Sequence, residues 1–191
     1  MRHRRVIIIL ALLIPAGAVT LFWLNDSRSA AEQAPGITFS LIDGSRVELD
    51  ALRGQPVMVH FWATTCRECR REIPELGALH RDLSPRGLEF IAVAMPYDPP
   101  NRVLEVAERT PLPYPVALDI DGTAVRAFGD VSLTPTTFLI SPKGEIVYRK
   151  TGPLDFKQLR NQIEDLLATK QRATSHESPA TGGPWLVAGG S

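Results

Sequence analysis

Cys66 and Cys69 are the only two cysteines in the chain, and Arg67 and Glu68 separate them. They follow an apolar run at residues 57–62, typical of a buried strand, and they open a pattern typical of a helix. A disulfide across so short a separation adds little loop-closure stability. The start of a helix surrounds a thiol with unpaired backbone N–H groups, which favour the thiolate. The spacing therefore indicates a thiol pair that is oxidised and reduced.

The competing hypotheses for this pair are a purely structural disulfide without redox activity and half of a zinc site. Zinc would need two more ligands at suitable spacing, and the chain holds no second cysteine pair. His60 and His80 would reach the cysteines only by coincidence. The redox interpretation is the favoured one.

Hydrophobic periodicity predicts the elements that would position these thiols. Asp43-Gly44 forms the turn of an N-terminal hairpin, and Pro74 is expected to kink the helix that holds it. The predicted strands are 57–62, 88–94, 116–118, 136–140 and 145–149, and the predicted helices are 67–83, 98–109, 123–128 and 156–167. This order predicts an α/β fold with a mixed sheet.

The N-terminus has the pattern of a membrane anchor. Residues 1–5 are basic, and residues 6–24 carry no charge, which is long enough to span a bilayer as a helix. Arginines before the span predict a cytoplasmic N-terminus and an exported remainder. The alternative is a cleaved signal peptide, with small residues at 29–31. Both interpretations place the cysteines outside the cytoplasm.

Composition and segment boundaries complete the predicted organisation. Twenty-one basic and 21 acidic side chains give a formal net charge of zero, so nothing favours a nucleic-acid partner. We expect a basic cytoplasmic stub and transmembrane anchor at 1–24, a linker at 25–35, a globular domain at 36–168 and a disordered tail at 169–191.

Three stretches together resemble a known family. They are F-x-L-x-D-G followed by L-x-x-L-x-G-x-x-V-x-V-x-F between residues 39 and 61, then F-W-A-T-T-C-x-x-C-R-x-E-x-P-E-L at 61–76, and T-P-T-T-F-L-I at 134–140. Over about residues 35–168 the chain resembles the TlpA/ResA/CcmG branch of the thioredoxin superfamily. The resemblance implies a thioredoxin fold with a central mixed sheet flanked by helices, an N-terminal hairpin extension and a transmembrane helix. One departure is Thr65, where the family usually has tryptophan.

The helix start and the resemblance assign roles to the residues around the thiol pair. Cys66 is expected to be the nucleophile and Cys69 the resolving thiol. The resemblance makes Glu72 a proton acceptor for Cys69, and the alternative is a surface glutamate paired with Arg70 or Arg71.

Further residues are expected to border the substrate. The resemblance implies a cis peptide bond at Pro135, so that the backbone beside Thr134 can pair with a client chain. Trp62 is expected to pack beside the site, and Met95-Pro96 is a weaker candidate for the same face. His60 is either a base or, as favoured, a core histidine with satisfied hydrogen bonds.

The resemblance implies a membrane-anchored, extracytoplasmic thiol–disulfide reductase. Its clients would be disulfide-containing exported proteins, with apocytochrome c as the family's best-known kind, and a membrane thiol would donate electrons. No cofactor beyond the Cys66–Cys69 disulfide is expected, and a monomer is expected. The alternatives are a periplasmic oxidant or isomerase and a non-catalytic module that binds client thiols. A peroxidase is disfavoured, because a catalytic threonine–cysteine arrangement is not clear despite Thr65.

Overall fold

A computed structural model describes residues 32–110 and 112–176. The predicted basic stub and anchor, most of the linker, and the tail beyond residue 176 lie outside these residues. Within the described ranges, no helix combines the length and apolarity needed to cross a bilayer. The fold belongs to the compact unit Gln33–Ser191.

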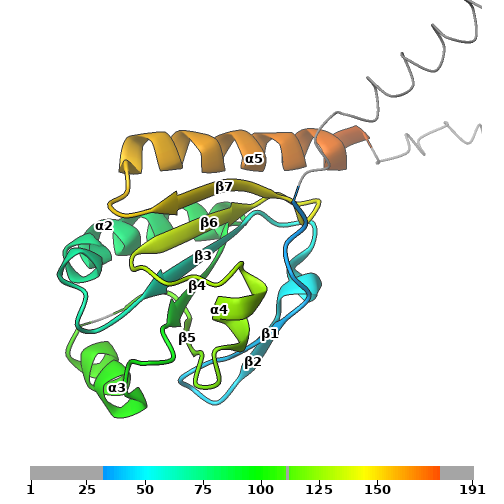
Figure 1. The fold of residues 1–191 in the computed structure, drawn as a ribbon. Coiled ribbons are helices and arrows are strands. Elements are labelled where there is room, and N and C mark those ends of the chain that lie inside the picture. The colour runs from blue at the N-terminus through cyan, green and yellow to red at the C-terminus, as the bar shows by residue number, and fades with distance from the viewer. Residues whose placement is uncertain (1–31, 111, 177–191) are drawn as a thin grey trace, which may run out of the picture. The chain divides into compact units, whose positions relative to one another are not determined.

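A five-stranded sheet in the order β5-β4-β3-β6-β7 forms the centre of the fold (Figure 1). Strands β3, β4 and β5 are parallel, and β6 runs antiparallel to β3. Strand β7 runs antiparallel to β6 and therefore has the same direction as β3. The strands are β3 Val57–Trp62, β4 Glu89–Ala94, β5 Val116–Leu118, β6 Thr136–Ile140 and β7 Ile146–Thr151. Strand β3 is buried at every position, as its run of apolar residues, interrupted only by His60, predicts for a central strand covered on both faces. The predicted mixed sheet is confirmed.

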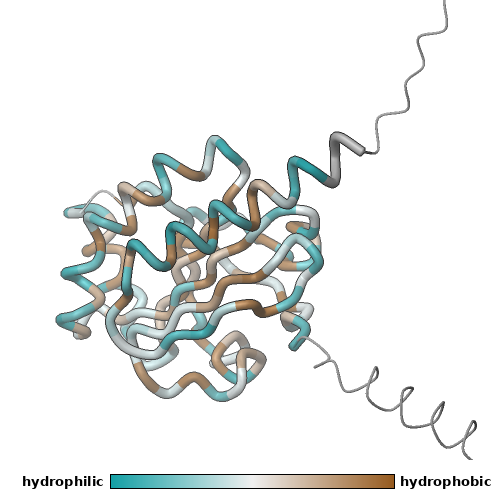
Figure 2. Tube along the Cα trace, turned by 90° about the horizontal axis from the view of Figure 1, so that it is seen from above, coloured by the Kyte–Doolittle hydropathy of each residue, from teal (hydrophilic) through white to brown (hydrophobic). Residues whose placement is uncertain are grey.

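Alternate residues of β3 face two different layers, because side chains alternate along a strand. Met58 and Trp62 pack into a core with residues of α2 Arg67–Leu83, α3 Pro100–Arg109 and α5 Phe156–His176. Val59 and Phe61 pack into a second core with α4 Thr123–Ala127 and the N-terminal hairpin. Hydrophobic residues gather along the central strands and alternate with hydrophilic ones on the helices (Figure 2).

The N-terminal hairpin consists of β1 Thr38–Ser40 and β2 Arg46–Glu48, paired antiparallel and followed by the 3-10 helix η1 Leu49–Leu52. Ile42 N–H donates to the Val116 carbonyl at 2.9 Å. Leu41 also forms an isolated antiparallel bridge with Ala117. The predicted hairpin extension is therefore confirmed, and it attaches to the edge strand β5.

Most predicted boundaries agree with the structure to within two residues, but the last helix does not. Its predicted end was Leu167, with disorder from about residue 169, whereas α5 continues to His176. The prediction was wrong because it took the tail as one Gly/Pro-rich segment. Its first residues, 169–174, contain no glycine or proline and are rich in residues that favour helices. The rest of the predicted tail lies outside the described residues.

Candidate active site

Cys66 and Cys69 form a disulfide at the start of α2, with their Cα atoms 5.3 Å apart. Cys66 is the N-cap residue of α2, and its Sγ accepts the Cys69 backbone N–H at 3.1 Å. Cys66 is partly exposed, whereas Cys69 is buried at 1% exposure. The outer sulfur can be reached from solvent, and the inner one lies behind it. The predicted helix start beside the thiol pair is confirmed.

A buried carboxylate holds the loop that precedes Cys66. Asp98 Oδ2 accepts the Thr64 backbone N–H at 2.5 Å, and Asp98 Oδ1 accepts the Thr64 hydroxyl at 2.6 Å. Asp98 lies in the loop between β4 and α3, and it is 4% exposed. Sequence analysis missed this residue. The sequence feature that could have indicated it is an aspartate just after a buried strand, because functional residues often lie at the carboxyl ends of parallel strands.

Glu72 lies three residues after Cys69 on the buried face of α2. It is 5% exposed, and its Oε1 accepts the Leu154 backbone N–H at 2.7 Å. Its Oε2 has no hydrogen-bond partner among the described residues. Burial raises the pKa of this carboxyl, because the ionised form loses hydration. The alternative of a surface glutamate paired with Arg70 or Arg71 is wrong, since Glu72 is buried and Arg71 pairs with Glu68 at 3.1 Å.

His60 occupies β3 on the same face as Trp62, and it is 2% exposed. Its Nδ1 lies 2.9 Å from the Thr137 hydroxyl on β6, a hydrogen bond whose direction depends on the tautomer. Its Nε2 and the Trp62 Nε1 have no partner among the described residues. Both side chains line a small internal cavity together with Cys69. Burial lowers the pKa of His60 to about 4, so the ring is neutral at neutral pH. The favoured interpretation, a core histidine with satisfied hydrogen bonds, is confirmed for the burial of His60. Only one of its two ring nitrogens, Nδ1, has a hydrogen-bond partner among the described residues.

The Thr134–Pro135 peptide bond is cis, as the resemblance implies. Thr136, at the start of β6, is paired with Phe61 near the end of β3. The cis peptide bond and the disulfide therefore lie at the same end of the sheet, where β3 finishes and β6 begins. No hydrogen bond engages the Thr134 backbone within the described part of the chain. The Pro135 carbonyl accepts the Gly152 N–H at 2.8 Å.

Three exposed hydrophobic side chains lie in loops at this same end of the sheet. They are Tyr97 after β4, Ile120 after β5, and Leu133 before the cis bond. Each is more than half exposed. In contrast, Trp62 and Met95 are each 3% exposed, so they support this end of the sheet from within. Exposed apolar side chains that gather at one end of the sheet suit contact with another protein.

Within the described ranges, no three His, Cys, Asp or Glu side chains lie close enough together to bind a metal ion.

Comparisons with known proteins agree with this geometry. Residues 30–149 match the AhpC/TSA family. The thiol-disulfide oxidoreductase ResA of Bacillus subtilis is 33% identical over 130 residues, covering 68% of this chain and 72% of that protein. A solution structure assigned as a thioredoxin from Neisseria meningitidis has a TM-score of 0.67 and 29% identity, over 78% of this chain and 99% of that one.

A crystal structure from Chlorobium tepidum, assigned as the thiol:disulfide interchange protein DsbE, gives a TM-score of 0.66 at 27% identity. It covers 72% of this chain and 96% of that one. The fold is therefore a thioredoxin fold, and the cysteine pair occupies the place expected for it. The chain belongs to the AhpC/TSA family, as a TlpA/ResA/CcmG-like thiol–disulfide oxidoreductase.

Proposed function

We propose that this oxidoreductase is a membrane-anchored, extracytoplasmic reductase of disulfides in exported proteins. The single observation that carries the proposal is the placement of the two sulfurs. Cys66 Sγ caps α2 and is partly exposed, while Cys69 is buried one turn further on. Amide N–H groups at a helix N-terminus favour a thiolate at the capping sulfur.

The reaction proceeds in two exchanges. The Cys66 thiolate attacks one sulfur of the client disulfide, forms a mixed disulfide and displaces the other client sulfur as a thiolate. Cys69 then gives up its proton, and its sulfur attacks Cys66 Sγ to form the Cys66–Cys69 disulfide and release the second client thiolate. Two electrons pass to the client, whose thiolates take up two protons. A membrane dithiol donor returns two electrons and two protons to the enzyme.

Glu72 is the proposed acceptor of the Cys69 proton. It shares the buried face of α2 with Cys69, and its raised pKa suits proton exchange nearer neutral pH. The Leu154 amide holds Oε1, which leaves Oε2 to receive the proton. Support for client binding comes from the unpaired Thr134 backbone and the exposed side chains Tyr97, Ile120 and Leu133.

The anchor and the exported location rest on the charge pattern of residues 1–24. Apocytochrome c is the client that the family resemblance suggests. Capture of mixed disulfides in cells by the Cys69→Ser variant, followed by identification of the attached proteins, tests the client class. If only cytoplasmic proteins are captured, the exported location is wrong.

Two measurements separate the reductase from its alternatives. Insulin reduction with dithiothreitol should be accelerated by the wild type and not by Cys66→Ser, whereas a non-catalytic binding module would give no acceleration. A strongly negative reduction potential supports a reductase. A potential near that of an oxidising catalyst would instead favour the oxidant or isomerase.

A further inference from the structure

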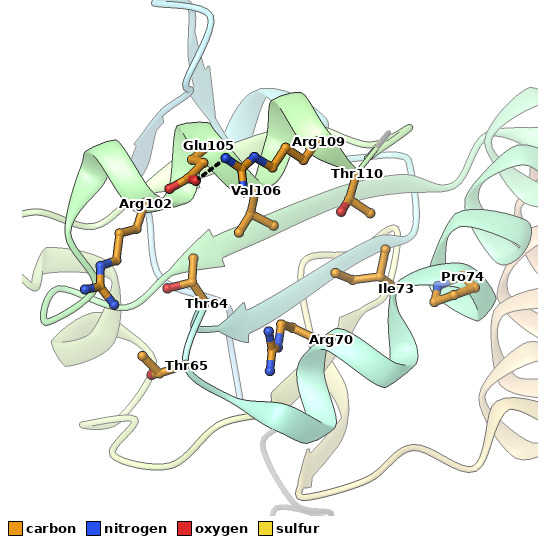
Figure 3. A pocket seen from close by; sticks show the side chains of 10 residues that line it. All are labelled: Thr64, Thr65, Arg70, Ile73, Pro74, Arg102, Glu105, Val106, Arg109 and Thr110. Atoms are coloured by element: carbon orange, nitrogen blue, oxygen red, sulfur yellow. Dashed lines mark ion pairs between the residues drawn. The ribbon is translucent and has the colours of Figure 1, made fainter.

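A groove of about 550 Å³ lies beside the disulfide, between the first half of α2 and α3 (Figure 3). Thr64 and Thr65, the two residues before Cys66, line one end of it. A tryptophan at position 65, usual in the family, would take up part of this space. The chain has a short, exposed threonine there instead.

The groove is lined by three arginines against one glutamate: Arg70 from α2, and Arg102, Arg109 and Glu105 from α3. Glu105 pairs with Arg109 at 2.8 Å. Arg70 and Arg102 have no ion-pair partner within residues 32–110 and 112–176. The groove therefore has a local positive charge, although the chain as a whole has none.

The two unpaired arginines come from different elements on either side of the threonine loop (Figure 3). The Arg70 backbone N–H donates to the Cys66 carbonyl at 3.2 Å, which places this residue one helical turn from the reactive sulfur. A guanidinium presents planar pairs of donors that match a carboxylate. Ile73, Pro74 and Val106 supply apolar surface to the same groove.

From these observations we infer that the groove binds an acidic stretch of the client chain next to the client disulfide. Carboxylates of the client engage Arg70 and Arg102, and the neighbouring part of the client chain packs against the apolar lining. The groove selects clients whose cysteines have aspartate or glutamate close by. This inference rests on the proposed reductase function and names its substrate class.

The test uses the pre-reduced full-length protein and three peptides of equal length. Each peptide holds one internal disulfide, flanked by glutamates, glutamines or lysines. The measured quantity is the second-order rate constant for disulfide reduction in a single turnover, expressed as the ratio of the glutamate peptide to the glutamine peptide. An exposed ion pair changes a binding constant by up to about fivefold, so two arginines should give a ratio of roughly ten. The ratio should fall with added salt, and the lysine peptide should be the poorest substrate.

Variants locate the effect. The double variant Arg70→Gln/Arg102→Gln should bring the ratio close to one. Arg46→Gln is the matched control, because Arg46 is exposed on β2 and has no ion pair among the described residues. It removes one positive charge away from the groove, half of what the double variant removes within it, and should leave the ratio unchanged.

The outcomes that overturn the inference are distinct from failure of the reductase function. Equal reduction of all three peptides by the wild type overturns the inference and leaves the reductase intact. Reduction of none of them overturns both. A third outcome uses oxidised glutathione as a probe. If its reduction alone depends on Arg70 and Arg102, the groove serves a small anionic disulfide and the acidic client is wrong.

Discussion

Neutral His60 in the core should make the stability of this protein fall steeply in mild acid. Burial lowers the pKa of His60 from 6.5 to about 4. Between these pH values the unfolded chain binds a proton that the folded protein does not, so unfolding is favoured as pH falls. The stabilising contribution is complete above pH 6.5 and is lost progressively as the pH approaches 4.

The magnitude follows from the size of the pKa change. Each unit of difference between the folded and unfolded pKa corresponds to about 1.4 kcal/mol, so the full effect of His60 is roughly 3 to 4 kcal/mol. Between pH 7.5 and pH 4.5 we expect roughly 2 to 3 kcal/mol of this stabilisation to be lost. That is a large share of the 5–15 kcal/mol that typically stabilises a domain.

The assay is urea unfolding of the oxidised protein at these two pH values, for the wild type and His60→Asn. Asparagine can still bond to the Thr137 hydroxyl, but it does not titrate. The variant should be less stable than the wild type at pH 7.5, and the difference in free energy of unfolding should shrink by roughly 2 to 3 kcal/mol at pH 4.5. Glu72 and His80 also titrate with shifted pKa values, but they are present in both proteins and cancel in the difference. A difference that is constant across this range would refute the reasoning.

Three further predictions concern the active site. Cys69→Ser should accumulate a mixed disulfide with a peptide substrate, detected by mass, and accumulation by Cys66→Ser instead would reverse the proposed roles. Because the raised pKa of Glu72 costs stability as pH rises above 4.5, Glu72→Gln should gain stability relative to the wild type between pH 4.5 and 7.5, measured by urea unfolding; no relative gain would argue against burial of an ionisable carboxyl. Asp98→Asn leaves one acceptor oxygen for the two donors of Thr64, so it should cost about 1–3 kcal/mol and slow insulin reduction, and an unchanged rate would show that this anchor does not position Cys66.

The parts of the fold that the sequence predicted best are those with local signals. The largely apolar run of β3 and the helical periodicity of α2 predicted the bounds of both elements correctly. The thiol pair was placed correctly, because the helix starts directly after Cys66. The end of α5 was missed, because residues 169–172 are polar and nothing local separates an exposed helical turn from a tail.

The parts that could not be predicted depend on contacts between distant positions. Glu72 was ambiguous in the sequence, because its partner Leu154 is 82 residues away. Asp98 was overlooked because its bond to Thr64 spans 34 residues between two loops. The basic groove is equally non-local, since Arg70 and Arg102 come together only when α3 packs beside α2.

The thiol pKa of Cys66 in the reduced protein tests the central claim most directly. It can be followed by thiolate absorbance or by the rate of alkylation across pH, with Cys69→Ser used to isolate this sulfur. Stabilisation by the amides that begin α2 predicts a pKa clearly below the value of about 8.5 for a free cysteine. A Cys66 pKa at or above that value would show that the helix start does not activate the sulfur, and the proposed nucleophile would be wrong.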